Sequence, residues 1–152
     1  MKIQVQGSRV EEKKFDFSYY LFGFFLLIEK TMKENSVIFR KSFAFAVKIY
    51  HLNKMLINNR EYSIADQILR AGTSIGANVE EGFGGHTLKE FAVRYSTAYK
   101  EARESRYWLR IIKETQLIPY EQVNPLIEDC EELLRLLGSA QKTLRAKLQT
   151  KT

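Results

Sequence analysis

Lysine and arginine residues recur along one flank of a heptad-patterned segment that begins near Leu88. Guanidinium and ammonium groups in a row can hold the phosphates of a nucleic acid, and a tyrosine among them can stack on a base. A basic helix face that is simply solvated is the alternative. The residues expected to contact nucleic acid are Lys89, Tyr99, Arg103, Arg106, Arg110 and Lys113, together with Lys142 and Arg145 near the C-terminal end.

Carboxylates occupy the opposite flank of the same segment, chiefly Glu101 and Glu104. A helix with one positive and one negative edge suits head-to-tail packing of identical subunits and hence a closed ring, whereas ordinary solvated charges are the alternative. Trp108 and Ile111 lie off the heptad seam, where they either pack on a neighbouring helix or anchor a subunit interface. We therefore assign these four residues to a predicted subunit interface.

Residues that could catalyse a reaction or bind a metal do not form a recognisable group. His51 and His86 lie on different segments, and neither belongs to a metal-binding spacing. Cys130 lies on an apolar seam, which is typical of a small buried side chain. The sequence therefore predicts no catalytic residue, no metal site and no cofactor, and we expect a protein that is not an enzyme.

Four amphipathic helices must position the charged residues, and no segment after residue 35 alternates as a strand would. The expected helices cover about residues 36–57, 63–82, 88–115 and a segment after Pro119. Short connections between them predict an all-α, antiparallel up-and-down four-helix bundle. The two charged edges of the third helix favour its assembly as a cyclic homo-oligomer. The predicted core seam of the first helix consists of Phe39, Phe43, Ala46, Tyr50 and Ile57.

Helix ends are also predicted from the sequence. Ser63 is expected to cap the second helix and Gly82 to end it. Thr87 and Glu90 have the spacing of a capping box at the start of the third helix, where the strict heptad begins. Pro125 is expected in the first turn of the fourth helix, where a missing backbone amide costs little.

Composition is consistent with one folded domain of 152 residues that has a net charge of +6. The single cysteine cannot form an internal disulfide, which favours the cytoplasm. The apolar run at residues 19–28 is shorter than the roughly 20 residues that span a bilayer, so no membrane partner is expected.

We predict a bundle domain at residues 36–148 and an N-terminal extension at residues 1–35, with Met32 as the native start. An N-terminal strand or helix that docks its aromatic side on the bundle is the alternative.

Several separate segments resemble, in order, the bacterial "four helix bundle protein" family, whose first members were products of reading frames within large-subunit ribosomal RNA genes. This resemblance covers about residues 36–144. The family is similar in fold to the accessory protein of diversity-generating retroelements, a basic pentameric ring that engages a reverse transcriptase and nucleic acid. The matching segments are Gln67-Ile68-Leu69-Arg70-Ala71, Ser74-Ile75-Gly76-Ala77-Asn78, Glu81-Gly82, Lys89-Glu90-Phe91, Lys100-Glu101-Ala102-Arg103-Glu104-Ser105 and Tyr107-Trp108-Leu109.

What the resemblance implies is a homopentamer with a role linked to nucleic acid and a protein partner such as a reverse transcriptase. The family has no established enzymatic activity. Together with the basic flank, this predicts a cytoplasmic homo-oligomer that binds RNA or DNA, with RNA preferred. The alternative is an oligomeric scaffold or adaptor for a protein partner, in which the basic residues are used in subunit or partner contacts.

Overall fold

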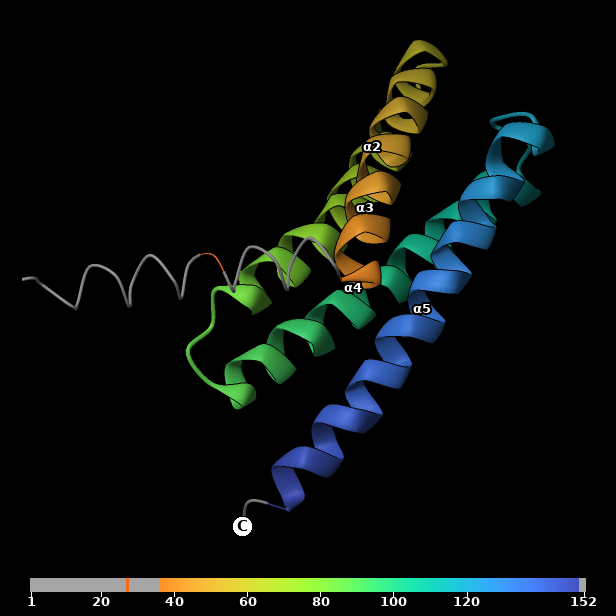
Figure 1. The fold of residues 1–152 in the computed structure, drawn as a ribbon. Helices are drawn as coiled ribbons and strands as arrows, with labels where there is room; N and C mark the ends of the chain where they lie inside the picture. Colours follow the sequence, from red (N-terminus) through yellow and green to blue (C-terminus); the bar gives the residue numbers. More distant parts are fainter. Residues whose placement is uncertain (1–26, 28–35, 151–152) are drawn as a thin grey trace, which may run out of the picture.

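The computed structural model describes residue 27 and residues 36–150, and this part of the chain contains four helices and no strand (Figure 1). The helices are α2 (Val37–Asn58), α3 (Tyr62–Phe83), α4 (Leu88–Glu114) and α5 (Tyr120–Gln149). Consecutive helices pack on each other through short connections, and α2 also contacts α5. The predicted all-α class is confirmed, and this packing fits a bundle. Apart from Leu27, the predicted extension with its proposed start at Met32 lies outside the described residues.

The buried side of α4 follows the predicted heptad. Tyr95, Ala102 and Leu109 are buried on one row, and Ala98, Ser105 and Ile112 are buried on the other. Opposite them, α5 buries its own apolar seam, which includes the cysteine. None of the four described helices is long and apolar enough to cross a membrane.

The predicted core seam of α2 is wrong. Phe43 is 68% exposed, Tyr50 is 48% exposed and Ile57 is 38% exposed, whereas Phe39 and Ala46 are half-buried. The helix itself carries large apolar side chains on several sides, so more than one of its faces shows the spacing of a buried helix face. The buried face contains two polar residues that obscured it in the sequence. It consists of Ser42, Phe45, Ile49, Leu52, Asn53 and Leu56.

Contacts with α3 explain why this second face is buried. The amide of Asn53 donates a 2.8 Å hydrogen bond to the backbone carbonyl of Ala65, so its polar group is satisfied within the core. Gly72 of α3 has no side chain, and this allows Ile49 to pack directly against its backbone. The neighbouring helix therefore selects which face of α2 is buried.

Three predicted helix-end roles are corrected by the structure. The second helix starts at Tyr62 with Glu61 at its N-cap, so Ser63 lies inside it and does not cap it. Gly82 does not end the same helix, which continues to Phe83, and it is buried there with a Cβ position only 3.3 Å from ring atoms of Tyr95. Pro125 is the sixth residue of α5 and so lies in its second turn, after Pro119 at the N-cap.

Candidate nucleic-acid interface

The start of α4 fixes the register of all its charged side chains. The backbone amide of Glu90 donates to the Thr87 hydroxyl at 3.1 Å, and the Glu90 carboxylate accepts from the Thr87 amide at 3.1 Å. The predicted capping box is therefore confirmed. With its heptad buried, the helix presents a fixed pair of flanks over about 40 Å at 1.5 Å per residue.

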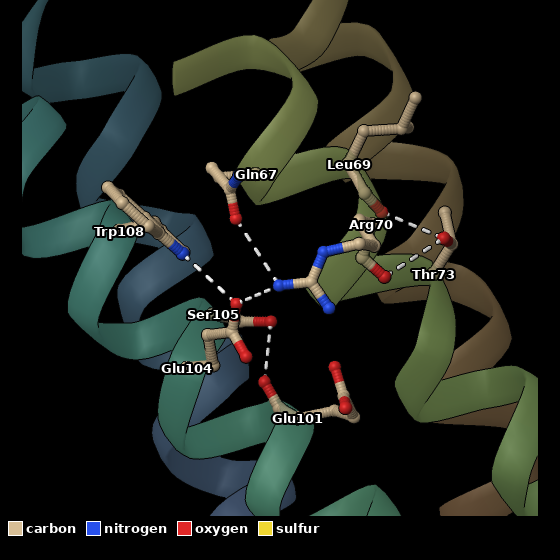
Figure 2. A network of polar contacts seen from close by, with 8 residues as sticks. All are labelled: Gln67, Leu69, Arg70, Thr73, Glu101, Glu104, Ser105 and Trp108. Carbon is tan, nitrogen blue, oxygen red and sulfur yellow. Dashed lines mark hydrogen bonds and ion pairs between the residues drawn. The ribbon is translucent and has the colours of Figure 1, made fainter. Parts of the chain in front are cut away.

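The acidic flank of α4 faces α3 of the same chain. Arg70 of α3 forms an ion pair with the Glu104 carboxylate, and the Trp108 indole donates to the same oxygen at 3.4 Å (Figure 2). The side chain of Gln67 accepts a 3.3 Å hydrogen bond from Arg70 and extends this network. The charge of Glu104 is therefore balanced within the chain.

Glu101 lies in the same region but has no such partner. Its Oε2 atom is buried and has no hydrogen-bond partner among the described residues. Burial raises the pKa of this carboxyl, and the nearby negative charge of Glu104 raises it further, while Arg70 opposes the change. Glu101 therefore differs from a solvated surface carboxylate, because one of its oxygen atoms is shielded from solvent.

The two predicted apolar interface residues are half-buried. Trp108 packs against the core of its own chain, and its ring makes an edge contact with Tyr107 at a centroid distance of 5.1 Å. Ile111 is likewise neither fully buried nor fully exposed. The first of the two alternatives, packing within the bundle, therefore describes Trp108. A further role of either residue between subunits stays a prediction.

One of the predicted phosphate-binding arginines already has a partner. Arg106 contacts Glu131 of α5 at 3.3 Å, with both side chains partly exposed. The neighbouring carboxylates of α5 are also paired, because Asp129 contacts Lys48 at 2.6 Å and Glu132 contacts Lys41 at 2.8 Å. These ion pairs link α5 to α2 and α4 and neutralise much of the acidic cluster on α5.

A shallow groove of about 430 Å³ lies along α4. Unlike Arg106, its other basic side chains form no ion pair with a described residue. Lys100, Arg103 and Arg110 make no ion pair with any described residue, and Tyr107 between them is 58% exposed. These four residues, here called the α4 basic stripe, follow one another at intervals of three and four and so share one helix face. Arg106 and Glu104 complete the lining of the groove.

The other predicted binding residues lie elsewhere. Tyr99 is half-buried against the core, with its ring beside Gly138 of α5. Lys113 lies over the Tyr120 ring, with its ammonium nitrogen 5.1 Å from the ring centre. Lys89 and Arg145 line a separate groove, and the exposed Lys142 lies on α5 three residues before Arg145.

Lys100 and Tyr107 were missed by the sequence reasoning. They are exposed on the outward face of α4, between the two charged flanks to which the predicted contacts belong. Their spacing from Arg103 and Arg110 on a single helix was the signal that could have identified them.

The histidine, acidic and cysteine side chains of the described residues are candidates for metal binding or nucleophilic catalysis. None of their histidine, cysteine, aspartate and glutamate side chains form a group of three that could hold a metal ion. Cys130 is buried and donates to the backbone carbonyl of Ala102 at 3.2 Å. Burial raises the pKa of this thiol to about 12, so it is protonated at neutral pH and is a poor nucleophile.

These features define an all-α, four-helix protein with a basic, solvent-facing helix. Residues 34–139 match the family model described as "23S rRNA-intervening sequence protein". The chain belongs to this family, as the resemblance of its motifs indicated.

A solved structure from Bacteroides thetaiotaomicron is similar, with 39% sequence identity and a TM-score of 0.67. The similarity covers 70% of this chain and 99% of that one, which is described as a protein of unknown function from the S23 ribosomal protein family. None of the curated proteins compared with the chain matches it.

Proposed function

We propose that this protein binds nucleic acid, preferably RNA, through the α4 basic stripe and that it catalyses no reaction. The observation that carries the proposal is the row of Lys100, Arg103 and Arg110, which make no ion pair with a described residue, beside the exposed ring of Tyr107. Cations that are not neutralised within the fold can replace the counterions of a phosphate backbone. The family's link to intervening sequences of ribosomal RNA supports RNA over DNA.

The arrangement favours contacts that do not depend on base sequence. From Lys100 to Arg110 the stripe extends about 15 Å at 1.5 Å per residue, so its cations can contact more than one phosphate. An exposed tyrosine can stack on any base, which contributes about 1–3 kcal/mol per base. Tyr107 takes this role in the proposal instead of Tyr99, since Tyr99 packs on the core.

Fluorescence anisotropy with a labelled single-stranded RNA tests the proposal. Arg103→Ala and Arg110→Ala should each weaken binding and reduce the dependence of log K on log salt by about 0.7 per lost contact. Lys54→Ala is the matched control, because it removes one exposed positive charge from α2, which packs on α3 and α5. Tyr107→Ala should weaken binding without changing the salt dependence.

Two results would contradict the proposal. One is the absence of any RNA binding at low salt. The other is binding that responds to Lys54→Ala as strongly as to Arg103→Ala. A surface that binds only through overall charge would behave in this second way.

We further propose that the chain forms a homo-oligomer, with a pentamer as the expected state. Support comes from α2, where Phe43, Val47 and Tyr50 present an exposed apolar row on one side of the helix. Apolar patches of this kind are typical of protein interfaces. Light scattering coupled to size-exclusion chromatography should give a multiple of the subunit mass, and Phe43→Ser should lower it. A wild-type monomer at micromolar concentration would refute this assembly.

A further inference from the structure

A second groove lies between the beginning of α4 and the end of α5. Its volume is about 180 Å³, close to the roughly 150 Å³ of a cavity that admits benzene. It therefore has room for one large apolar side chain. It is lined by Lys89, Ala92, Val93 and Ser96 of α4 and by Gln141, Leu144, Arg145 and Leu148 of α5.

The walls of this groove are held in place by contacts within the chain. The side-chain amide of Gln141 donates to the backbone carbonyl of Tyr95 at 3.3 Å and ties α5 to α4. Leu144 is 7% exposed and belongs to the core, whereas Val93 is 58% exposed. The groove thus has an ordered apolar floor and an accessible apolar wall.

The charged side chains that line the groove are all positive. Lys89 and Arg145 line it, no carboxylate does, and neither of the two makes an ion pair with a described residue. Lys142 is exposed one turn before Arg145 on α5. An occupant of complementary chemistry would combine an apolar side chain with flanking negative charges.

We propose that this groove binds an acidic amphipathic helix of a partner protein. A leucine or phenylalanine of the partner inserts over Leu144 and Val93, and its carboxylates one turn away contact Lys89 and Arg145. Amphipathic helices bind apolar grooves in this manner, with anchors spaced by threes and fours. The site is separate from the α4 basic stripe and does not depend on the proposed RNA binding.

Nucleic acid fits this groove less well than a protein helix. No aromatic side chain lines it, so a base has no stacking partner there. A charged phosphate also gains nothing by contact with the apolar floor. A second copy of the chain also fits less well. Its acidic and apolar helix is α5, where Asp129, Glu131 and Glu132 are already paired with side chains of the same subunit.

Two labelled helical peptides of about 15 residues test the proposal. Both carry leucines at helical spacing, and one has glutamates on its flanks where the other has lysines. We expect the glutamate peptide to bind the full-length protein and the lysine peptide not to bind. Val93→Glu and the double variant Lys89→Glu/Arg145→Glu should each weaken binding at least about tenfold, equivalent to about 1.4 kcal/mol.

Variants in the α4 basic stripe provide the matched control. Arg103→Glu/Arg110→Glu reverses the same number of charges and should leave peptide binding within about twofold, which is under about 0.4 kcal/mol. The same proteins are assayed with the single-stranded RNA probe, and circular dichroism checks that each is folded. If the wild-type protein binds the glutamate peptide but not RNA, only the proposed function is contradicted, whereas loss of RNA binding in the stripe variant alone is what that function predicts.

Four outcomes would overturn the inference. The glutamate peptide does not bind, or it binds equally well to the Val93→Glu protein. RNA binding is lost in Lys89→Glu/Arg145→Glu but kept in the stripe variant, which identifies a nucleic-acid site. The Lys89→Glu/Arg145→Glu protein has a lower oligomer mass than the wild type, which identifies a second copy as the occupant.

Discussion

Gly72 is the position at which the close approach of α2 and α3 can be tested most directly. A Cβ atom at this residue would lie 2.8 Å from both Cγ1 and Cγ2 of Ile49 and 3.2 Å from its Cβ. Both residues are buried, and a β-branched side chain in a helix has essentially one χ1 rotamer. Gly72→Ala therefore requires the two helices to separate, since Ile49 cannot rotate away.

The expected magnitude follows from two opposing effects. Carbon atoms prefer separations of about 3.5–4.0 Å, so the contact must open by nearly 1 Å. Overpacking of a core by one methyl group costs about 1–3 kcal/mol. Replacing a helical glycine by alanine returns up to about 1 kcal/mol. We expect Gly72→Ala to destabilise the fold by about 1–2 kcal/mol, or a few degrees in Tm for a chain of this length.

Gly138→Ala is the matched control. A Cβ atom there would lie 3.6 Å from Cε2 of Tyr99, which is ordinary contact, so only the gain in helix propensity remains. Urea unfolding followed by circular dichroism, at one protein concentration, should show the two variants moving in opposite directions. Ile49→Ala combined with Gly72→Ala should cost less than the sum of the two single changes, because Ile49→Ala removes the Cγ1 and Cγ2 atoms with which the new Cβ atom clashes.

A Gly72→Ala protein that is as stable as the wild type would refute this prediction. That result would mean that α2 and α3 separate at no cost, and that the missing side chain does not select the buried face of α2. A destabilisation that is fully additive with Ile49→Ala would place the cause elsewhere.

Three further predictions concern the helix cap at Thr87, the Cys130 thiol and the partly buried carboxyl of Glu101. Thr87→Ala should cost about 0.5–2 kcal/mol in urea unfolding, because the Glu90 amide loses its acceptor. Cys130 should react with a thiol reagent only after unfolding, since it is buried and its pKa is raised to about 12, and rapid labelling of the native protein would contradict this. The raised pKa of Glu101 means that its contribution to stability is greatest below the unfolded value and falls as pH rises through the folded value. Glu101→Gln should therefore gain stability relative to the wild type between about pH 4 and pH 7, measured as urea midpoints at both values.

The sequence determined α4 almost completely. Its apolar residues repeat strictly by heptads with charged residues on both flanks, so one face alone can be buried. The capping box at Thr87 and Glu90 then fixed the start of the helix from local spacing. Arg103 and Arg110 could be placed on the surface for the same reason.

Tertiary structure decided what local spacing leaves undetermined. The buried face of α2 depends on Ala65 and Gly72, which lie on another helix. Glu104 is balanced by Arg70 of α3 and Arg106 is paired with Glu131 of α5, so the availability of each charge depends on residues distant in sequence. Periodicity reports which side chains share a face, whereas only the packed helices show which of those charges are already paired.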